Sequence, residues 1–242
     1  MDSTGLLMLE IAENLVEIKR RIAGACQRAG RDTASVQLIA VSKTFSADAI
    51  GVAVDAGQSH FGESRLQEAE PKIEALPGSL HWHFIGRLQR NKVRRVLSLF
   101  EVVHAIDSLR LARYADDVAR ELGLFPKVFL EVNLGEETSK GGFELHALRT
   151  EIDALLSLER LEIIGLMGIP PVGPDAESAR PWFAALRGMR DELADETGVP
   201  LSFLSMGMSG DFEVAIEEGA THVRVGSSIF GKRAYRVDDE LG

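Results

Sequence analysis

Short apolar runs of strand length alternate along this chain with segments in which apolar residues recur at helical spacing. Short apolar runs bounded by turn residues are typical of buried strands, and apolar residues spaced three or four apart are typical of amphipathic helices. The pattern predicts eight strands, and each predicted strand is followed by a longer polar or amphipathic segment. The strands are predicted at 36–41, 58–61, 81–85, 101–105, 127–132, 161–167, 201–205 and 221–225.

Helical stripes occur before the first predicted strand and between later ones. The stripes are formed by Ile11, Leu15, Ile18 and Ile22; by Leu111, Ala115, Val118 and Leu122; by Leu145, Leu148, Ile152 and Leu155; and by Phe183, Leu186, Met189 and Leu193. Ser46, Ser108 and Asp175 are of the residue types that cap helix N-termini. The first stripe therefore predicts a helix within residues 1–30 that precedes the repeating units.

Repeated strand–helix units imply parallel strands joined by right-handed crossovers. Eight such units in 242 residues predict an α/β fold, a closed (β/α)8 TIM barrel, as one domain over 1–242. Residues 36–233 would form the barrel and 234–242 an acidic tail. An open doubly wound sheet is the alternative, although no GxGxxG motif follows the first strand. The Pro- and Gly-rich stretch 168–174 directly follows a strand, so we interpret it as a strand-to-helix loop and not as a linker.

Composition narrows the classes of function. The chain has 27 basic and 37 acidic residues and a formal net charge of −10, which argues against a broad nucleic-acid or anionic-membrane surface. Cys26 is the single cysteine, so no disulfide can form within the chain, as suits a cytoplasmic protein. We find neither a secretion signal nor an apolar run long enough to span a bilayer.

Lys43 is the lysine placed just beyond the C-terminal end of a strand-like run. An amine at such a position can lose part of its solvation and its proton and then attack a carbonyl. In TIM barrels the site forms at this end of the strands, and phosphate groups often bind at the loops after the seventh and eighth strands. Ser209 and Gly210 follow the seventh strand, and Gly226 and Ser227 follow the eighth.

Both of these segments would open a helix, where free backbone N–H groups favour an anion. Barrel closure makes the eighth strand a neighbour of the first, so Lys43 would lie beside the phosphate cradle. A reactive lysine next to a phosphate cradle predicts a phosphorylated aldehyde as ligand.

Arg224 belongs to the last strand, in which Val223 and Val225 suit the helix-facing side. Strand alternation then points Arg224 into the barrel. A buried guanidinium needs an acid or a ligand. Arg224 could therefore form a structural ion pair or face the ring nitrogen of a cofactor.

Seven motifs in order along residues 36–233 carry a resemblance to a known family. They are Ala40-Val41-Ser42-Lys43-Thr44; Phe61-Gly62-Glu63 with Gln67-Glu68; Trp82-His83-Phe84-Ile85-Gly86 with Leu88-Gln89 and Asn91-Lys92; Glu131-Val132-Asn133 with Ser139-Lys140; Gly165-Leu166-Met167 with Ile169-Pro170; Leu204 to Asp211; and Val223-Arg224-Val225-Gly226 with Ile229-Phe230-Gly231. The chain resembles the YggS (proline synthetase co-transcribed, PROSC) family of pyridoxal phosphate-binding proteins, which is related to the N-terminal barrel of alanine racemase.

The resemblance implies that pyridoxal 5'-phosphate is the cofactor and that Lys43 holds it as an aldimine. It also implies that Ser209, Gly210, Gly226 and Ser227 bind the phosphate and that Arg224 faces the pyridine nitrogen. The chain departs from the family at Ser64-Arg65, where the family has Asn-Tyr, and at Ser227-Ser228, where it has Thr-Ala. Ser227 keeps the hydroxyl group, whereas Ser64 is shorter than the asparagine it replaces.

Further residues bear on the predicted site. We expect Met167 to form part of its apolar wall, His83 to lie near the pocket and Lys140 to reach the barrel mouth. His81 and His83 share a strand face, but no third metal ligand is evident, so we predict no metal site. The basic cluster Arg87–Arg95 is either a solvated helix face or a site for an anion, a regulatory ligand or a partner.

Three functions fit these residues. The first is a pyridoxal phosphate-binding protein that takes part in homeostasis of the cofactor. The second is a weak pyridoxal phosphate-dependent racemase or transaminase, although racemisation needs a base on each face and neither Tyr114 nor Tyr235 matches that role. The third is a Schiff-base aldolase without cofactor. The expected partners are the cofactor and either amino acids or pyridoxal phosphate-dependent enzymes, and the expected state is a monomer.

Overall fold

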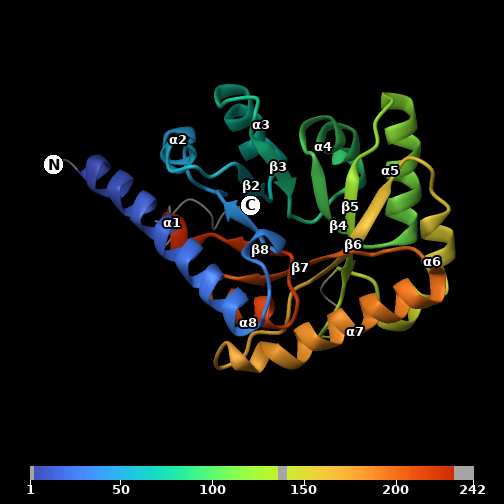
Figure 1. The fold of residues 1–242 in the computed structure, drawn as a ribbon. Coiled ribbons are helices and arrows are strands. Elements are labelled where there is room, and N and C mark those ends of the chain that lie inside the picture. The colour runs from blue at the N-terminus through green and yellow to red at the C-terminus, as the bar shows by residue number, and fades with distance from the viewer. Residues whose placement is uncertain (1–2, 136–140, 232–242) are drawn as a thin grey trace.

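The computed structural model describes residues 3–135 and 141–231, which form a closed barrel of eight parallel strands surrounded by helices (Figure 1). The strands are β1 (Gln37–Val41), β2 (His60–Glu63), β3 (His81–Phe84), β4 (Val102–Ile106), β5 (Lys127–Val132), β6 (Glu162–Gly168), β7 (Phe203–Met208) and β8 (His222–Val225). They pair in sequence order, and β8 closes the barrel against β1 through the register Ile39 to Arg224. The predicted (β/α)8 barrel is confirmed, and the open sheet is excluded.

The helices lie outside the strands (Figure 1). They are α1 (Ser3–Arg28), α2 (Ala47–Asp55), α3 (Leu66–Ala75), α4 (Val93–Leu99), α5 (Leu109–Leu122), α6 (Leu145–Leu156), α7 (Arg180–Thr197), α8 (Phe212–Glu217) and α9 (Ser227–Phe230), with short 3-10 turns at Thr33–Ser35, Arg90–Lys92 and Glu177–Ala179. Ser46 and Ser108 cap α2 and α5 as predicted, because their hydroxyls accept from the N–H groups of Ala49 and Leu111.

The N-terminal helix α1 packs against α2, α8 and α9 along one side of the barrel. Its predicted stripe is buried, from Ile11 to Ile22. Two ion pairs with α8 add to this packing, Arg21 to Glu213 at 2.6 Å and Arg28 to Glu217 at 2.7 Å. The predicted tail at 234–242 lies outside the described residues.

All eight predicted strands are present, with ends displaced by up to three residues. The largest displacement is in β7, which was predicted at 201–205 and runs from Phe203 to Met208. The buried Leu201 precedes the strand, and the apolar pattern continues beyond the predicted end to the buried Met206. The prediction began the strand too early because Leu201 packs into the apolar core before β7 begins.

The space inside the barrel differs from the space between strands and helices. A large apolar cluster fills the outer layer, whereas the interior apolar cluster is small and consists of Val102, Ala105, Phe129, Ile164 and Met167. Buried polar side chains occupy much of the remaining interior, among them those of His83, His104, Ser205 and Arg224. The barrel interior thus holds a polar network directly below the C-terminal strand ends.

Candidate functional site

A pocket of about 490 Å³ opens at the C-terminal ends of the strands. Its volume lies in the range of small-molecule and cofactor sites. Six of the predicted site residues line this pocket together, although they come from three segments distant in the sequence. The lining residues are Val41, Lys43, Phe45, Ser64, Ile85, Gly86, Ile169, Met208, Ser209, Gly210, Arg224, Gly226, Ser227 and Gly231.

Lys43 follows β1 in a tight turn in which the Phe45 N–H donates to the Ser42 carbonyl at 3.1 Å. The side chain of Lys43 is half-buried. The next residue, Thr44, has a φ of 72°, and its N–H donates to Glu68 Oε2 at 3.0 Å. A β-branched residue in the left-handed region is strained, and such strain persists only where surrounding contacts impose it. The turn that carries Lys43 is therefore held in one conformation.

A buried cluster on the helix-facing side of the strands fixes the residue before Lys43. The Ser42 hydroxyl donates to Glu63 Oε1 at 2.7 Å, and the Lys72 ammonium donates to the same oxygen at 2.7 Å and to the Ser42 carbonyl at 3.0 Å. We call Ser42, Glu63 and Lys72 the clamp. Burial raises the pKa of Glu63, while the bond and charge of Lys72 oppose that rise. Glu63 is fully buried, and its Oε2 has no hydrogen-bond partner in the part of the chain that the structure describes.

Backbone N–H groups of the segment after β8 converge on one oxygen. The N–H groups of Gly226 and Ser228 point to Ser209 Oγ at 3.1 and 3.5 Å. In the loop after β7, Asp211 Oδ1 accepts from the Met208 N–H at 2.6 Å and holds the loop that carries Ser209 and Gly210. A Cβ added at Gly210 would meet nothing within 4 Å, so the loop leaves open space there. This geometry provides N–H donors and a hydroxyl for an anionic group.

Arg224 points into the barrel, as strand alternation predicted, and its side chain is almost fully buried. Its guanidinium donates to Ser205 Oγ at 2.5 Å and to the Gly168 carbonyl at 3.3 Å. No carboxylate among the described residues pairs with it directly. Burial lowers the pKa of Arg224 to about 10, and the charges of Glu131 and Asp211 oppose that shift. Because Arg224 also lines the pocket, its remaining N–H groups can serve a ligand.

Two predicted site residues lie below the pocket and not in its wall. Met167 is 2% exposed and belongs to the interior apolar cluster. His83 is also 2% exposed, and its ring bonds to the rings of His60 and His104. His83 pairs with Gly62 in the sheet, whereas the pocket begins further along this segment, at Ile85 and Gly86. His83 therefore lies deeper in the barrel than the residues that line the pocket, and its contact with a cofactor stays a prediction.

The side chains of the basic cluster differ in their surroundings. Arg94 and Arg95 form ion pairs with Glu121 and Glu70. Arg90 lies over the ring of Tyr114, 4.3 Å from its centroid. Arg87, Arg90 and Arg110 line a shallow surface pocket together with Asp107 and Ser108. Lys140 lies outside the described residues.

Sequence reasoning missed the clamp lysine and several lining residues. Lys72 is a helix residue nine positions after Glu63, and nothing in its local sequence marks it as buried. Gly86 gave a clearer signal because it belongs to a quoted motif. A Cβ at Gly86 would lie 2.2 Å from the Ser64 carbonyl oxygen, so the loop after β3 passes against the loop after β2 at this point.

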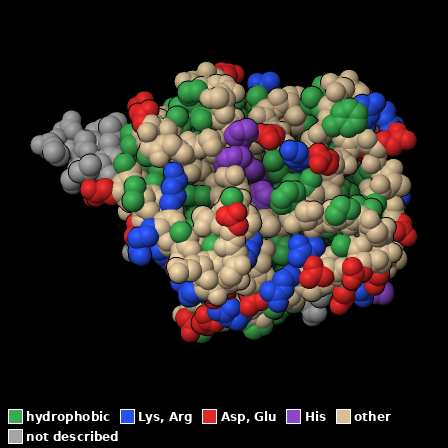
Figure 2. Space-filling model, in the orientation of Figure 1, with side chains coloured by type: hydrophobic (Ala, Val, Ile, Leu, Met, Phe, Trp, Pro, Cys, Tyr) green, Lys and Arg blue, Asp and Glu red, His purple; other side chains and the backbone are tan. Residues whose placement is uncertain are grey.

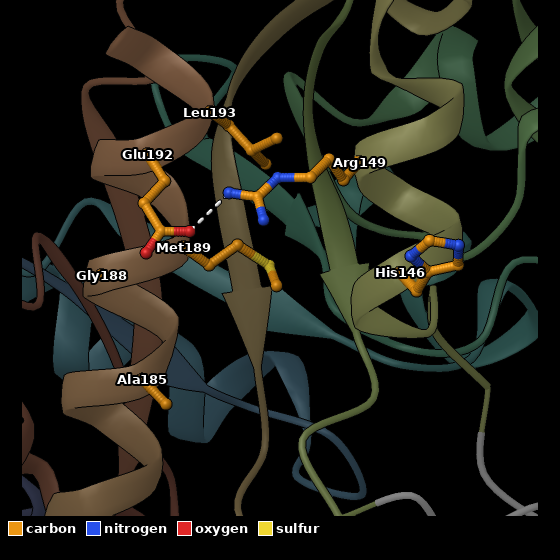
Figure 3. A pocket seen from close by; sticks show the side chains of 7 residues that line it. All are labelled: His146, Arg149, Ala185, Gly188, Met189, Glu192 and Leu193. Carbon is orange, nitrogen blue, oxygen red and sulfur yellow. Dashed lines mark hydrogen bonds and ion pairs between the residues drawn. The ribbon is translucent and has the colours of Figure 1, made fainter. Parts of the chain in front are cut away.

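A second hollow lies between α6 and α7 (Figure 3). Arg149 reaches across it to Glu192 at 2.5 Å and also bonds to Glu196 at 3.2 Å. Its charge is therefore balanced, and the other residues drawn with it are mostly apolar or small. This groove offers no arrangement of groups for chemistry.

Neither a metal site nor a membrane span is found in the part of the chain that the structure describes. No three His, Cys, Asp or Glu side chains of residues 3–135 and 141–231 are placed to hold a metal ion. No helix among these residues is long and apolar enough to cross a membrane.

Comparison with known proteins gives a consistent result. The family model for the alanine racemase N-terminal domain matches residues 13–234. Pyridoxal phosphate homeostasis protein of Aquifex aeolicus is 43% identical over 228 residues, which cover 94% of this chain and all of that protein. The protein of the same name from Escherichia coli K12 is 43% identical over 235 residues, covering 94% of this chain and 99% of that one. This chain belongs to the family of the pyridoxal phosphate homeostasis proteins.

Solved structures agree with this family at the level of the fold. PipY of Synechococcus elongatus, solved with pyridoxal phosphate bound, is 42% identical to this chain and superposes on it with a TM-score of 0.81. The match covers 91% of this chain and all of PipY. Alanine racemase of Clostridium difficile matches 91% of this chain with a TM-score of 0.69 at 14% identity, which shows a shared fold alone. The match covers 62% of that racemase chain.

Proposed function

We propose that this chain binds pyridoxal 5'-phosphate through Lys43 and takes part in homeostasis of the cofactor. The observation that carries the proposal is the convergence of a half-buried lysine, an N–H cradle and a buried arginine on one pocket of about 490 Å³. These three groups match the aldehyde, the phosphate and the ring nitrogen of the cofactor. The names of the relatives and the cofactor bound to PipY support the same assignment.

Each group has a role that follows from its chemistry. When bound, pyridoxal phosphate supplies an aldehyde that condenses with an amine, and the clamp and the strained turn at Thr44 orient the Lys43 amine for that bond. The N–H groups of Gly226 and Ser228 now meet Ser209 Oγ, so a phosphate oxygen can share or replace that position. The hydroxyl of Ser227 adds a donor beside them.

Arg224 would face the ring nitrogen. Ser205 and the Gly168 carbonyl accept two of the N–H groups of its guanidinium, which leaves donors on the pocket side. A guanidinium has no acceptor and keeps its proton, so the ring nitrogen would accept a hydrogen bond and remain unprotonated. That arrangement suits storage of the cofactor. An unprotonated pyridine ring withdraws electron density from a bound substrate less strongly than a protonated ring does, so it activates the substrate less.

The lining residues favour homeostasis over racemisation or transamination. Among the described residues that line the pocket, none is a tyrosine, histidine, aspartate or glutamate. Proton abstraction on both faces of a substrate carbon needs two bases, and Lys43 supplies one. The pocket can therefore hold and release the cofactor, with its amine position open to exchange with free amino acids.

We also propose a cytoplasmic monomer that folds as one domain over the whole chain. The supports are the single cysteine, which is buried, and the closure of β8 on β1, which leaves no barrel edge for a partner strand. The partners we propose are the cofactor itself, amino acids that compete for its aldehyde, and enzymes that receive it. Light scattering after size-exclusion chromatography would contradict the monomer if the mass were twice that of the chain.

Borohydride trapping tests the proposed function. The purified protein is incubated with pyridoxal phosphate, reduced and digested, and the modified peptide is identified by mass spectrometry. We expect a single major adduct at Lys43, which a Lys43→Ala variant lacks, and weaker labelling by pyridoxal, which has no phosphate. Equal labelling of several surface lysines in wild type and variant would contradict the proposal.

A further inference from the structure

Five of the six histidines of this chain lie in or at the end of the barrel interior. His60, His81 and His222 are the first residues of β2, β3 and β8, and His83 and His104 are buried further in. Figure 2 shows histidine side chains gathered in a hollow on one face of the molecule. Cofactor binding at the opposite strand ends does not explain this accumulation, and no group of metal-ligating side chains is found among the described residues.

A continuous row of hydrogen bonds joins three of these histidines to Arg224. Arg224 donates to Ser205 Oγ at 2.5 Å, and Ser205 Oγ lies 2.8 Å from His104 Nδ1. His104 Nε2 lies 3.0 Å from His83 Nδ1, and His83 Nε2 lies 3.0 Å from His60 Nδ1. The row crosses the interior from β8 through β7, β4 and β3 to β2.

The donor-only chemistry of Arg224 gives this row a direction. Ser205 has one proton to donate, and among the described residues its hydroxyl contacts Arg224 and His104. Arg224 cannot accept a hydrogen bond, so the Ser205 proton goes to His104 Nδ1. If His104 donated instead, the proton of a fully buried hydroxyl would have no acceptor, which costs about 1–3 kcal/mol.

The direction then passes along the row. A neutral imidazole that accepts at Nδ1 carries its proton on Nε2. His104 therefore donates to His83, and His83 donates to His60. Only His60 Nε2 is left at the end, where the partly exposed ring can donate to water.

We propose that Ser205, His104, His83 and His60 form one directed hydrogen-bond chain that positions Arg224 for the cofactor ring, with all three histidines neutral and protonated on Nε2. This proposal rests on the proposed function for the role of Arg224, whereas the direction of the chain does not. A proton added to His83 or His104 would place two N–H groups face to face and break a link. Burial lowers the pKa of His83 and of His104 well below the ordinary value, in agreement with neutral rings.

His222 provides a matched control. Like His104, it packs against Phe129, whose ring centroid lies 5.1 Å from that of His222 and 4.5 Å from that of His104. Its Nδ1, however, bonds to Thr221 Oγ1 at 2.9 Å and not to any member of the hydrogen-bond chain. A substitution at His222 disturbs the packing of the interior without removing a link.

The first test reads the tautomers in wild-type protein without cofactor. Long-range 1H–15N spectra of histidine-labelled protein at neutral pH distinguish protonated from unprotonated ring nitrogens. We expect protonated Nε2 and unprotonated Nδ1 at His60, His83 and His104, each assigned by its own substitution. A protonated Nδ1 or a doubly protonated ring at any of these three histidines would refute the proposed direction of the hydrogen-bond chain. This measurement needs no variant that preserves cofactor binding.

The second test reads the positioning role by absorbance titration with pyridoxal phosphate. His104→Phe leaves Ser205 without its acceptor, and the loss of about one hydrogen bond in fixing Arg224 should weaken binding roughly 3- to 10-fold and shift the absorption band. His104→Asn retains an acceptor near the Nδ1 position and should restore most of the affinity, whereas His222→Phe should bind like wild type. Equal binding and equal spectra for His104→Phe and His222→Phe would overturn the positioning role. A wild type with the expected tautomers but no lysine-bound cofactor would refute the proposed function, and the role of Arg224 with it.

Discussion

Lys72→Met is the perturbation for which the structure gives the clearest expectation. The Lys72 side chain is 9% exposed, and its ammonium bonds to the fully buried Glu63 at 2.7 Å and to the Ser42 carbonyl at 3.0 Å. Methionine fills a similar volume but leaves the Glu63 carboxylate without its counter-charge. Removal of one partner of a buried ion pair costs about 3–5 kcal/mol. In a chain of this length that lowers the melting temperature by roughly 10 °C.

A double variant separates the charge from the packing. Glu63→Leu combined with Lys72→Met removes both charges and leaves the Ser42 hydroxyl without an acceptor, which costs about 1–2 kcal/mol. The double variant should therefore be more stable than Lys72→Met alone. Lys19→Met is the control, because Lys19 is exposed and touches only backbone carbonyls at 3.4 and 3.5 Å. It should change the free energy of unfolding by less than about 0.5 kcal/mol.

The pH dependence of the penalty gives a second readout. Without Lys72 the Glu63 carboxyl can avoid its buried charge by taking up a proton, so the cost should be smaller at pH 5 than at pH 8. Urea unfolding of wild type, Lys72→Met, the double variant and Lys19→Met at both pH values measures these free energies. A Lys72→Met penalty below about 1 kcal/mol, or a double variant no more stable than Lys72→Met alone, would refute the clamp.

The other predictions concern backbone strain, close packing and one titration. Gly86→Ala places a Cβ 2.2 Å from a backbone oxygen and should lower the free energy of unfolding by more than about 2 kcal/mol. Gly51→Ala, in open space on α2, should raise it by up to about 1 kcal/mol. Similar melting temperatures for the two variants would contradict this prediction. Thr44→Gly relieves the φ of 72° and should leave the melting temperature unchanged or higher, while a loss above about 1 kcal/mol would contradict strain at this residue. Burial lowers the pKa of His222 to about 4, so the unfolded chain takes up this proton first as the pH falls, and stability is lost from pH 6.5 down to pH 4. Relative to His222→Phe, the wild type should lose roughly 2 kcal/mol between pH 7 and pH 5 in urea titrations, and parallel pH profiles would contradict the shift.

The sequence pattern was sufficient for the architecture and for the faces of the strands. Alternation placed Arg224 inside the barrel, and barrel closure placed Lys43 beside the segments after β7 and β8. These inferences rest on local periodicity and on a small set of chain topologies, both of which a sequence carries.

Depth within the barrel was harder to predict, because periodicity gives the face of a residue but not its height. Height depends on strand stagger, which is a property of the whole closed sheet. The sequence predicted His83 near the pocket and Met167 in its wall, whereas both lie beneath the residues that line it.

Contacts between distant segments were also beyond the pattern. Lys72, on α3, meets Ser42, which lies 30 positions earlier and directly after β1. His104 meets Ser205 across 101 positions of sequence. Each of these residues is common in its element, and only the fold reveals its partner.

The most direct test of the account is the visible absorption spectrum of the purified protein as pyridoxal phosphate is added, recorded for wild type and for Lys43→Ala. The account predicts a yellow wild type whose lysine-bound cofactor band saturates at one equivalent and is absent from the variant. A wild type that stays colourless, or a band of equal strength in Lys43→Ala, would contradict it.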